Sequence, residues 1–169
     1  TDVNERALEL ARLTLALNEV EAEVRAGSLY EPVRRDRFDL IVSNPPFVMS
    51  PPRAEAETLA YRETNFEGDA LVETLIRGAA DRLNPGGSLQ LLTNWAVLDE
   101  PWQDRLDSWV PDGCDAWVIE RERLDVFSYV EMCLADAGLA GSPAWRGAYH
   151  EWLAYVDRLG GRALGMGGL

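Results

Sequence analysis

The chain has 169 residues, and 47% of them are hydrophobic, which is enough for one domain with its own core. Its formal net charge is −13, and this acidity disfavours unaided binding to nucleic acid, because neutralising phosphates requires a basic surface. No apolar stretch is long enough to span a bilayer and no signal peptide is present, so we expect a cytoplasmic protein without a membrane partner. The two cysteines, Cys114 and Cys133, lack metal-ligand spacing, which is typical of reduced intracellular proteins.

The N-terminal third of the chain predicts a helix followed by two strands. Asn4 is a candidate N-cap for a helix over residues 5–18, in which leucines recur at helical spacing. A short strand is expected over 24–29. The apolar run over 38–42 is the strongest strand signal in the chain.

This second strand ends in Asn44-Pro45-Pro46-Phe47. The two prolines cannot continue a central strand, and they fix the backbone where the strand ends. The Asn44 amide and the neighbouring backbone carbonyls are therefore held at the carboxyl edge of a sheet, where open α/β folds bind ligands. A rigid pair of acceptors beside the flat ring of Phe47 suits a planar, weakly nucleophilic NH2 group. The motif therefore predicts amino-group chemistry.

A long polar loop is expected over residues 48–66, and loops of this length are usually functional or mobile. Five of its side chains have the chemistry to meet a substrate, although solvent exposure is the simpler interpretation for each: Arg53, Tyr61, Arg62, Asn65 and Phe66.

Asp69 is then expected to cap a helix that ends at Asn84-Pro85-Gly86-Gly87. Further along, the pattern predicts strands over 89–93 and 116–120, helices over 102–109, 126–137 and 145–159, and a last strand within 162–169. Strands that alternate with helices indicate an α/β fold built on a doubly wound, mostly parallel sheet.

The order of elements, with Asn-Pro-Pro-Phe after one strand and Asn-Pro-Gly-Gly before the next, resembles class I S-adenosylmethionine-dependent methyltransferases over nearly the whole chain. The tetrapeptide is similar to that of the amino-methylating branch. This branch includes adenine amino methyltransferases of DNA, guanine amino methyltransferases of ribosomal RNA and release-factor glutamine methyltransferases. The resemblance implies a Rossmann-like fold, S-adenosylmethionine as cofactor, and a macromolecular substrate. The acceptor is an amino group of either a protein glutamine or a nucleic-acid base, and the acidity of the chain favours protein.

The resemblance also implies roles for the residues of the motif. Asn44 and the carbonyl of Pro45 are expected to accept hydrogen bonds from the target NH2 group, Pro46 to complete the clamp, and Phe47 to stack on the planar acceptor. The cofactor supplies an electrophilic methyl group, so the protein has mainly to align the reacting atoms, and no metal or strong general base is required.

For the cofactor, Asp2 matches the acidic residue that binds the ribose hydroxyls in this family, and Ser28 with Leu29 matches the adenine contact. Asn44 borders the same cofactor. Two structural alternatives stay open, namely that Asp2 merely caps a helix and that Ser28 is a turn residue. Outside the motifs, His150 is expected at the surface and Trp95 is expected to pack in the core.

The family's first strand and its glycine-rich turn would precede Thr1, and the glycine run 165–168 is no substitute because it follows a helix. We therefore expect residues 1–169 to be a partial methyltransferase domain, incomplete at the N-terminus, with 126–159 a helical addition before the last strand. The upstream segment of the same protein is then a partner, and the isolated chain should be inactive. The alternative is a non-catalytic methyltransferase-like domain that acts as a binding platform. A nucleotide-binding dehydrogenase is a third possibility, but it lacks its glycine fingerprint here.

Overall fold

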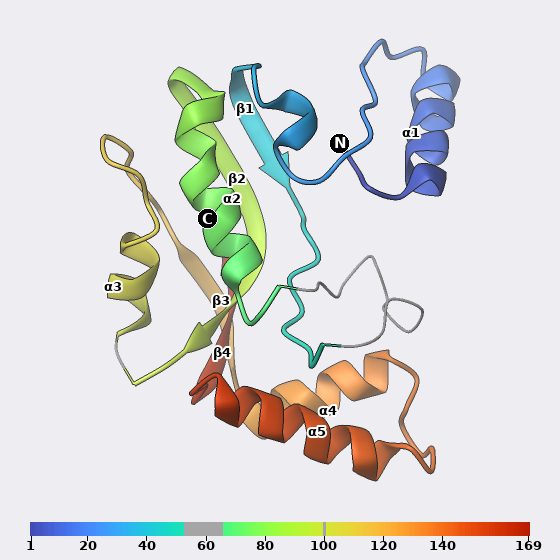
Figure 1. Ribbon diagram of the computed structural model, residues 1–169, viewed down its shortest axis with the longest axis vertical. Helices are drawn as coiled ribbons and strands as arrows, with labels where there is room; N and C mark the ends of the chain where they lie inside the picture. The colour runs from blue at the N-terminus through green and yellow to red at the C-terminus, as the bar shows by residue number, and fades with distance from the viewer. Residues whose placement is uncertain (53–65, 100) are drawn as a thin grey trace.

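The computed structural model describes residues 1–52, 66–99 and 101–169 (Figure 1). Four of the candidate substrate-contacting residues lie outside the described residues: Arg53, Tyr61, Arg62 and Asn65. The helices are α1 (Glu5–Leu17), α2 (Ala70–Ala79), α3 (Trp102–Asp107), α4 (Val126–Asp136) and α5 (Trp145–Arg158), with short 3-10 turns η1 (Glu31–Val33) and η3 (Ala80–Arg82). The strands are β1 (Phe38–Ser43), β2 (Leu83–Val97), β3 (Ile119–Asp125) and β4 (Ala163–Gly168).

The four strands form one sheet in the order β1-β2-β4-β3. β1 pairs with β2 in parallel, whereas β4 is antiparallel to both of its neighbours, β2 and β3. β1, β2 and β3 therefore run in one direction, and only β4 is reversed. The predicted α/β class with a mostly parallel sheet is confirmed.

Helices cover both faces of the sheet because successive side chains of β2 point to opposite sides. Leu91 and Trp95 pack against α2 and α3, in a core that also contains Leu75 and Trp109. Ala96 lies in the other core, which is formed mainly by α4, α5 and β4. Trp95 is fully buried with its ring centroid 5.1 Å from that of Trp102, so its predicted packing role is confirmed.

The glycines near the C-terminus belong to β4, where they permit close packing rather than forming a ligand-binding turn. A Cβ atom at Gly165 would lie 2.3 Å from the Trp95 side chain, and one at Gly167 would lie 2.0 Å from the Ile119 carbonyl oxygen. Side chains at these positions would displace the tryptophan or the neighbouring strand. The glycine run thus brings β4 close to β3 and to the large ring on β2.

Two strand predictions were wrong. Residues 24–29 form no strand, and only an isolated parallel bridge joins Asp2 to Ala26, because no longer strand lies beside this segment among the described residues. The strand predicted over 116–120 instead runs from Ile119 to Asp125, because its register is set by pairing with β4 rather than by local hydrophobicity. The helices predicted over 5–18, 126–137 and 145–159 are confirmed to within one residue at each end. No helix among the described residues is long and apolar enough to cross a membrane.

Candidate active site

Asn44-Pro45-Pro46-Phe47 leaves the sheet directly after β1, at the carboxyl end of a parallel strand. Pro45 is buried, Pro46 and Phe47 are half-buried, and Asn44 is exposed. This burial fixes the backbone of the motif and leaves the Asn44 amide free to meet a ligand. The position at the sheet edge is the one that the sequence predicts.

The motif lines a cavity of about 480 Å³, which we call the Asn44 cavity. The segment directly after β1 contributes four of the lining residues, β2 and β4 contribute one each, and the last two turns of α4 contribute the rest. The lining residues are Asn44, Pro45, Phe47, Val48, Asn94, Met132, Cys133, Asp136 and Met166. A mostly apolar wall with a few polar groups is typical of sites for small planar ligands.

A buried tyrosine holds the chain that follows the motif. The Tyr129 hydroxyl, on α4, accepts a hydrogen bond from the Met49 N–H at 3.0 Å and also hydrogen-bonds with the side chains of Asn94 and Cys133. Burial raises the pKa of Tyr129 well above its ordinary value, so the hydroxyl keeps its proton. This cluster ties the segment after β1, the interior of β2 and helix α4 together behind the cavity.

Helix α4 is aligned by its N-cap. Asp125 accepts hydrogen bonds from the Ser128 hydroxyl at 2.6 Å and the Ser128 N–H at 3.0 Å, and these bonds lower the pKa of the Asp125 carboxyl. About two turns after the N-cap, Met132 and Asp136 follow each other at the i,i+4 spacing that puts both on one side of a helix. That side lines the Asn44 cavity.

Of the residues predicted to contact the cofactor, Asn44 lines the Asn44 cavity, whereas Asp2, Ser28 and Leu29 lie together near the N-terminus and outside that lining. One Asp2 carboxylate oxygen accepts the Asn4 N–H at 2.8 Å, while the Asn4 side chain caps α1 through the Ala7 N–H. Ser28 is exposed in a turn whose carbonyl accepts the Glu31 N–H at 2.9 Å, and Leu29 has a φ of 48°. Asp2 therefore supports the helix start without being the cap itself, and its second carboxylate oxygen has no hydrogen-bond partner among the described residues.

Sequence reasoning missed six lining residues of the Asn44 cavity: Val48, Asn94, Met132, Cys133, Asp136 and Met166. Asn94 carried a usable signal, because a polar amide inside an otherwise apolar strand is 2% exposed and needs a hydrogen-bond partner. The others are ordinary helix, strand and loop residues that only tertiary packing brings to the motif. His150 is exposed beside Tyr149, as predicted, and Phe66 is 41% exposed in the segment before α2.

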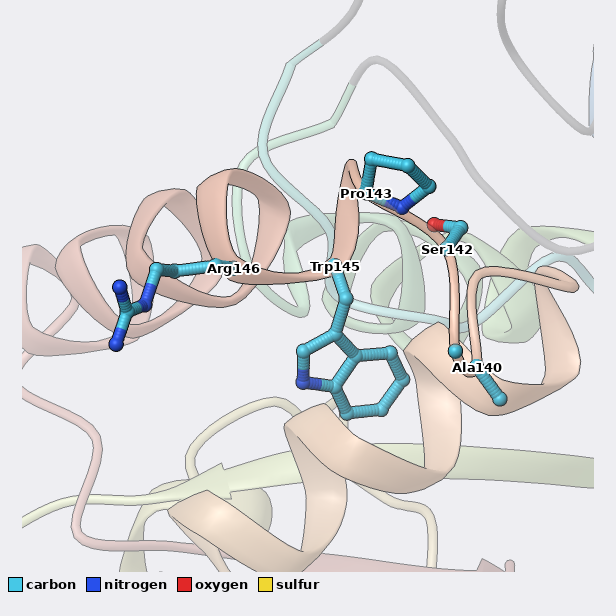
Figure 2. Close-up of a pocket in the computed structure, with 6 residues that line it drawn as sticks. Ala140, Ser142, Pro143, Trp145 and Arg146 are labelled. Carbon is cyan, nitrogen blue, oxygen red and sulfur yellow. The ribbon is translucent and has the colours of Figure 1, made fainter.

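A second cavity, of about 410 Å³, lies where α4 turns into α5 (Figure 2). It is lined by Ser142, Pro143 and Trp145 together with Ala140, Gly141 and Arg146. The Trp145 ring faces the turn while Arg146 points away along α5 (Figure 2). The Ser142 hydroxyl is buried without a hydrogen-bond partner among the described residues, and no base or nucleophile joins it there. This cavity shares no lining residue with the Asn44 cavity.

Comparison with known proteins identifies the family. A family model described as "Methyltransferase small domain" matches residues 1–101, which is well over half of the chain. The curated relatives include proteins named ribosomal RNA small subunit methyltransferase C from Escherichia coli O7:K1, O6:H1 and K12, each 41% identical over 106 residues. The aligned region covers 63% of this chain but 26% of each relative, so the chain spans about a quarter of their length. The chain belongs to the methyltransferase small domain family, among the class I S-adenosylmethionine-dependent methyltransferases of the amino-methylating branch.

Proposed function

We propose that this chain forms the acceptor-binding part of an S-adenosylmethionine-dependent N-methyltransferase that modifies an amino group of a nucleic-acid base. The observation that carries this proposal is the placement of Asn44, Pro45 and Phe47 on one cavity at the carboxyl end of β1. The amide oxygen of Asn44 and the carbonyl of Pro45 are two acceptors, and Phe47 is a flat apolar surface beside them.

The relatives favour a nucleic acid over a protein glutamine. Their names refer to ribosomal RNA, and the glutamine alternative gains no support from them. The net charge of −13 pointed toward protein, but charge describes the surface of this chain alone. Because the chain spans about a quarter of its relatives' length, we propose that phosphate contacts are made by parts of the protein outside it.

The cofactor side fits the ribose end of S-adenosylmethionine. One oxygen of Asp2 is committed to the Asn4 N–H, while the second is available to accept hydrogen bonds from ribose hydroxyls at an exposed position. Ser28 and Leu29 lie close by, since the Thr1 hydroxyl donates to the Leu29 carbonyl and Asp2 bridges to Ala26. When bound, the cofactor supplies a sulfonium methyl group that is already electrophilic.

The chain's own residues then prepare the acceptor. Hydrogen bonds from the NH2 group to Asn44 Oδ1 and the Pro45 carbonyl hold both hydrogens and draw the nitrogen lone pair out of conjugation with the ring. Stacking on Phe47 keeps the base plane fixed, so the nitrogen faces one direction. Alignment of this kind lowers the barrier by proximity rather than by bond-making from the protein. The methylated nitrogen would carry a positive charge, and it would release one proton to solvent to give the neutral methylamino group.

Replacing Asn44 in the complete protein tests the proposal. Asn44→Ala should lower kcat for methyl transfer to ribosomal RNA by about 100-fold or more, as expected when a hydrogen-bonding group that acts in the transition state is removed. Because Asn44 is exposed, folding should not change. Asn18→Ala, at the far end of α1, is the matched control and should retain activity.

Two outcomes would contradict the proposal. Unchanged methyl transfer in Asn44→Ala would remove Asn44 from the mechanism and favour the non-catalytic binding platform. Methyl transfer by the wild-type protein to a release factor instead of RNA would show that the acceptor is a protein and not a nucleic-acid base. The isolated chain should bind S-adenosylmethionine weakly or not at all, and tight stoichiometric binding in calorimetry would show that the described cofactor residues suffice.

A further inference from the structure

We propose that Asp136 selects the acceptor base by accepting a hydrogen bond from the ring N–H next to the reacting amino group. This inference deepens the proposed function and rests on it. It assigns a specificity role to a residue outside the Asn-Pro-Pro-Phe motif and about ninety residues away in sequence, which α4 brings to the same cavity.

The position of Asp136 brings its carboxylate to the cavity that contains the two motif acceptors. It is the last residue of α4 and is exposed, and it lines the Asn44 cavity together with Met132 one turn earlier. Among the residues that the structure describes, no arginine or histidine forms an ion pair with it. The carboxylate is therefore available to a ligand.

An acidic residue at the C-terminal end of α4, where Asp136 lies, does not stabilise the helix. The carboxyl end of a helix carries partial negative charge, so a carboxylate there is disfavoured. The last turn of α4 has no basic residue to offset it. Asp125 at the opposite end of α4, by contrast, has a structural role, because its carboxylate accepts the Ser128 N–H as the N-cap of the helix. An acid that the helix does not favour and that borders a cavity points to a role in binding.

The three polar groups define which base edge fits. The Asn44 amide oxygen, the Pro45 carbonyl and the Asp136 carboxylate are all acceptors, so they match an edge that presents only donors. Guanine presents its 2-amino group beside a ring N–H, and thus meets all three. Adenine and cytosine present an amino group beside an unprotonated ring nitrogen, whose lone pair would face the carboxylate. Asp136 therefore favours the edge of guanine and disfavours the corresponding edges of adenine and cytosine.

The apolar residues that line the cavity suit a flat ring and require no further hydrogen bonds from it. Phe47 offers an aromatic face, while Met132 and Met166 contribute thioethers, which pack well against π systems. These contacts do not distinguish one base from another. Discrimination consequently depends on the polar edge, and on Asp136 in particular, since the two motif acceptors are satisfied by any amino group.

A base analogue that lacks the ring N–H tests the proposed hydrogen bond to Asp136. In the complete protein, methyl transfer is compared between a target RNA with guanine and the same RNA with 2-aminopurine, which keeps the amino group but replaces the ring N–H by an acceptor nitrogen. The wild-type protein should prefer guanine by about tenfold or more in kcat/KM, the usual size of a hydrogen bond to a charged group. Asp136→Asn, whose amide can donate to that nitrogen, should reduce the preference by about tenfold.

Two variants serve as controls. Glu131→Gln removes one negative charge from the same helix at an exposed position outside the cavity, and should leave the preference unchanged. Asp136→Glu keeps a carboxylate and should retain the preference for guanine. Thermal melting of each variant confirms that it is folded before its preference is compared.

The outcomes separate this inference from the function on which it rests. If the wild-type protein methylates RNA and Asp136→Asn shows the wild-type preference, Asp136 has no part in selection and the proposed function stands. If the wild-type protein methylates 2-aminopurine as well as guanine, the ring N–H is not read. If no RNA is methylated by the wild-type protein, the proposed function is overturned, and this inference with it.

Discussion

The two ends of the molecule are packed in different ways. Around the Asn44 cavity, Tyr129, Trp152 and Leu164 are at most 1% exposed, and α4 and α5 pack on each other and on the sheet. On α1, next to the predicted cofactor residues, only Leu8 is buried, while Leu13 and Leu17 are 54% and 75% exposed (Figure 1). The region around the Asn44 cavity thus rests on a core that the chain makes for itself, and the region around α1 does not.

The same contrast runs across the sheet. Trp95 and Leu91 are covered by α2 and α3, whereas Leu40, Val42 and Leu92 are more than half exposed. Exposed aliphatic side chains on a strand face usually mark a surface that contacts another element. One part of the sheet is therefore covered by helices, and another part presents apolar side chains at the surface.

The largest expected effect on stability is in the core formed by α4 and α5, beside the Asn44 cavity. Trp152→Ala removes a fully buried ring from the core of α4 and α5 and should destabilise the protein by about 3–5 kcal/mol. Urea denaturation followed by circular dichroism measures the loss. A change of less than about 1 kcal/mol would mean that this core is not what holds the domain together, and the comparison would fail.

A smaller loss is expected when the hydroxyl behind the cavity is removed. Tyr129→Phe leaves the Met49 N–H without its partner and should cost about 1–3 kcal/mol. Tyr149→Phe, at a half-buried ring on α5, should cost little and is the matched control. Equal unfolding midpoints for the two variants would show that the Tyr129 cluster does not stabilise the segment after the motif.

The contact between the N-terminal segment and α2 should respond to alkaline pH. The Tyr30 hydroxyl donates to the Leu75 carbonyl at 2.8 Å, and burial raises the pKa of Tyr30 to about 12. The unfolded chain loses this proton near pH 10 while the folded chain keeps it, so stability is present below about pH 10 and declines toward about pH 12. Thermal melting across this range should show the decline, and Tyr30→Phe should make it shallower. An identical slope in both proteins would exclude Tyr30 as its source.

The smallest effect is expected on α1. Leu13→Ala removes a largely exposed side chain and should change the stability of the isolated chain by less than about 0.5 kcal/mol, apart from a slight gain in helix propensity. In the complete protein the same change should cost more if another element covers this helix face. Equal and small effects in both proteins would show that α1 stays uncovered, which would sharpen the contrast between the two ends.

Much of the fold followed from local patterns. The helices over 126–137 and 145–159 were predictable because their apolar residues recur at helical spacing and turn residues separate them. Strand pairing was less predictable. The stretch Ile119–Asp125 consists mostly of charged residues and lacks a strong strand signal, yet it pairs with β4 along its length. The segment 24–29 has the apolar character of a strand, but it has only Asp2 beside it.

The amino-acid sequence by itself determined the backbone of the motif, because two prolines after an apolar strand restrict the Asn44 backbone through purely local sterics. It also determined the family, which the comparisons confirmed. Only the tertiary structure decided what surrounds Asn44. Asn94, Met132, Asp136 and Met166 come from different elements, and their meeting depends on the crossover that places β4 between β2 and β3 and on the packing of α4 against the sheet. Contacts between residues so far apart in sequence leave no periodic trace along the chain, so the residues that complete the cavity were visible only once the sheet was assembled.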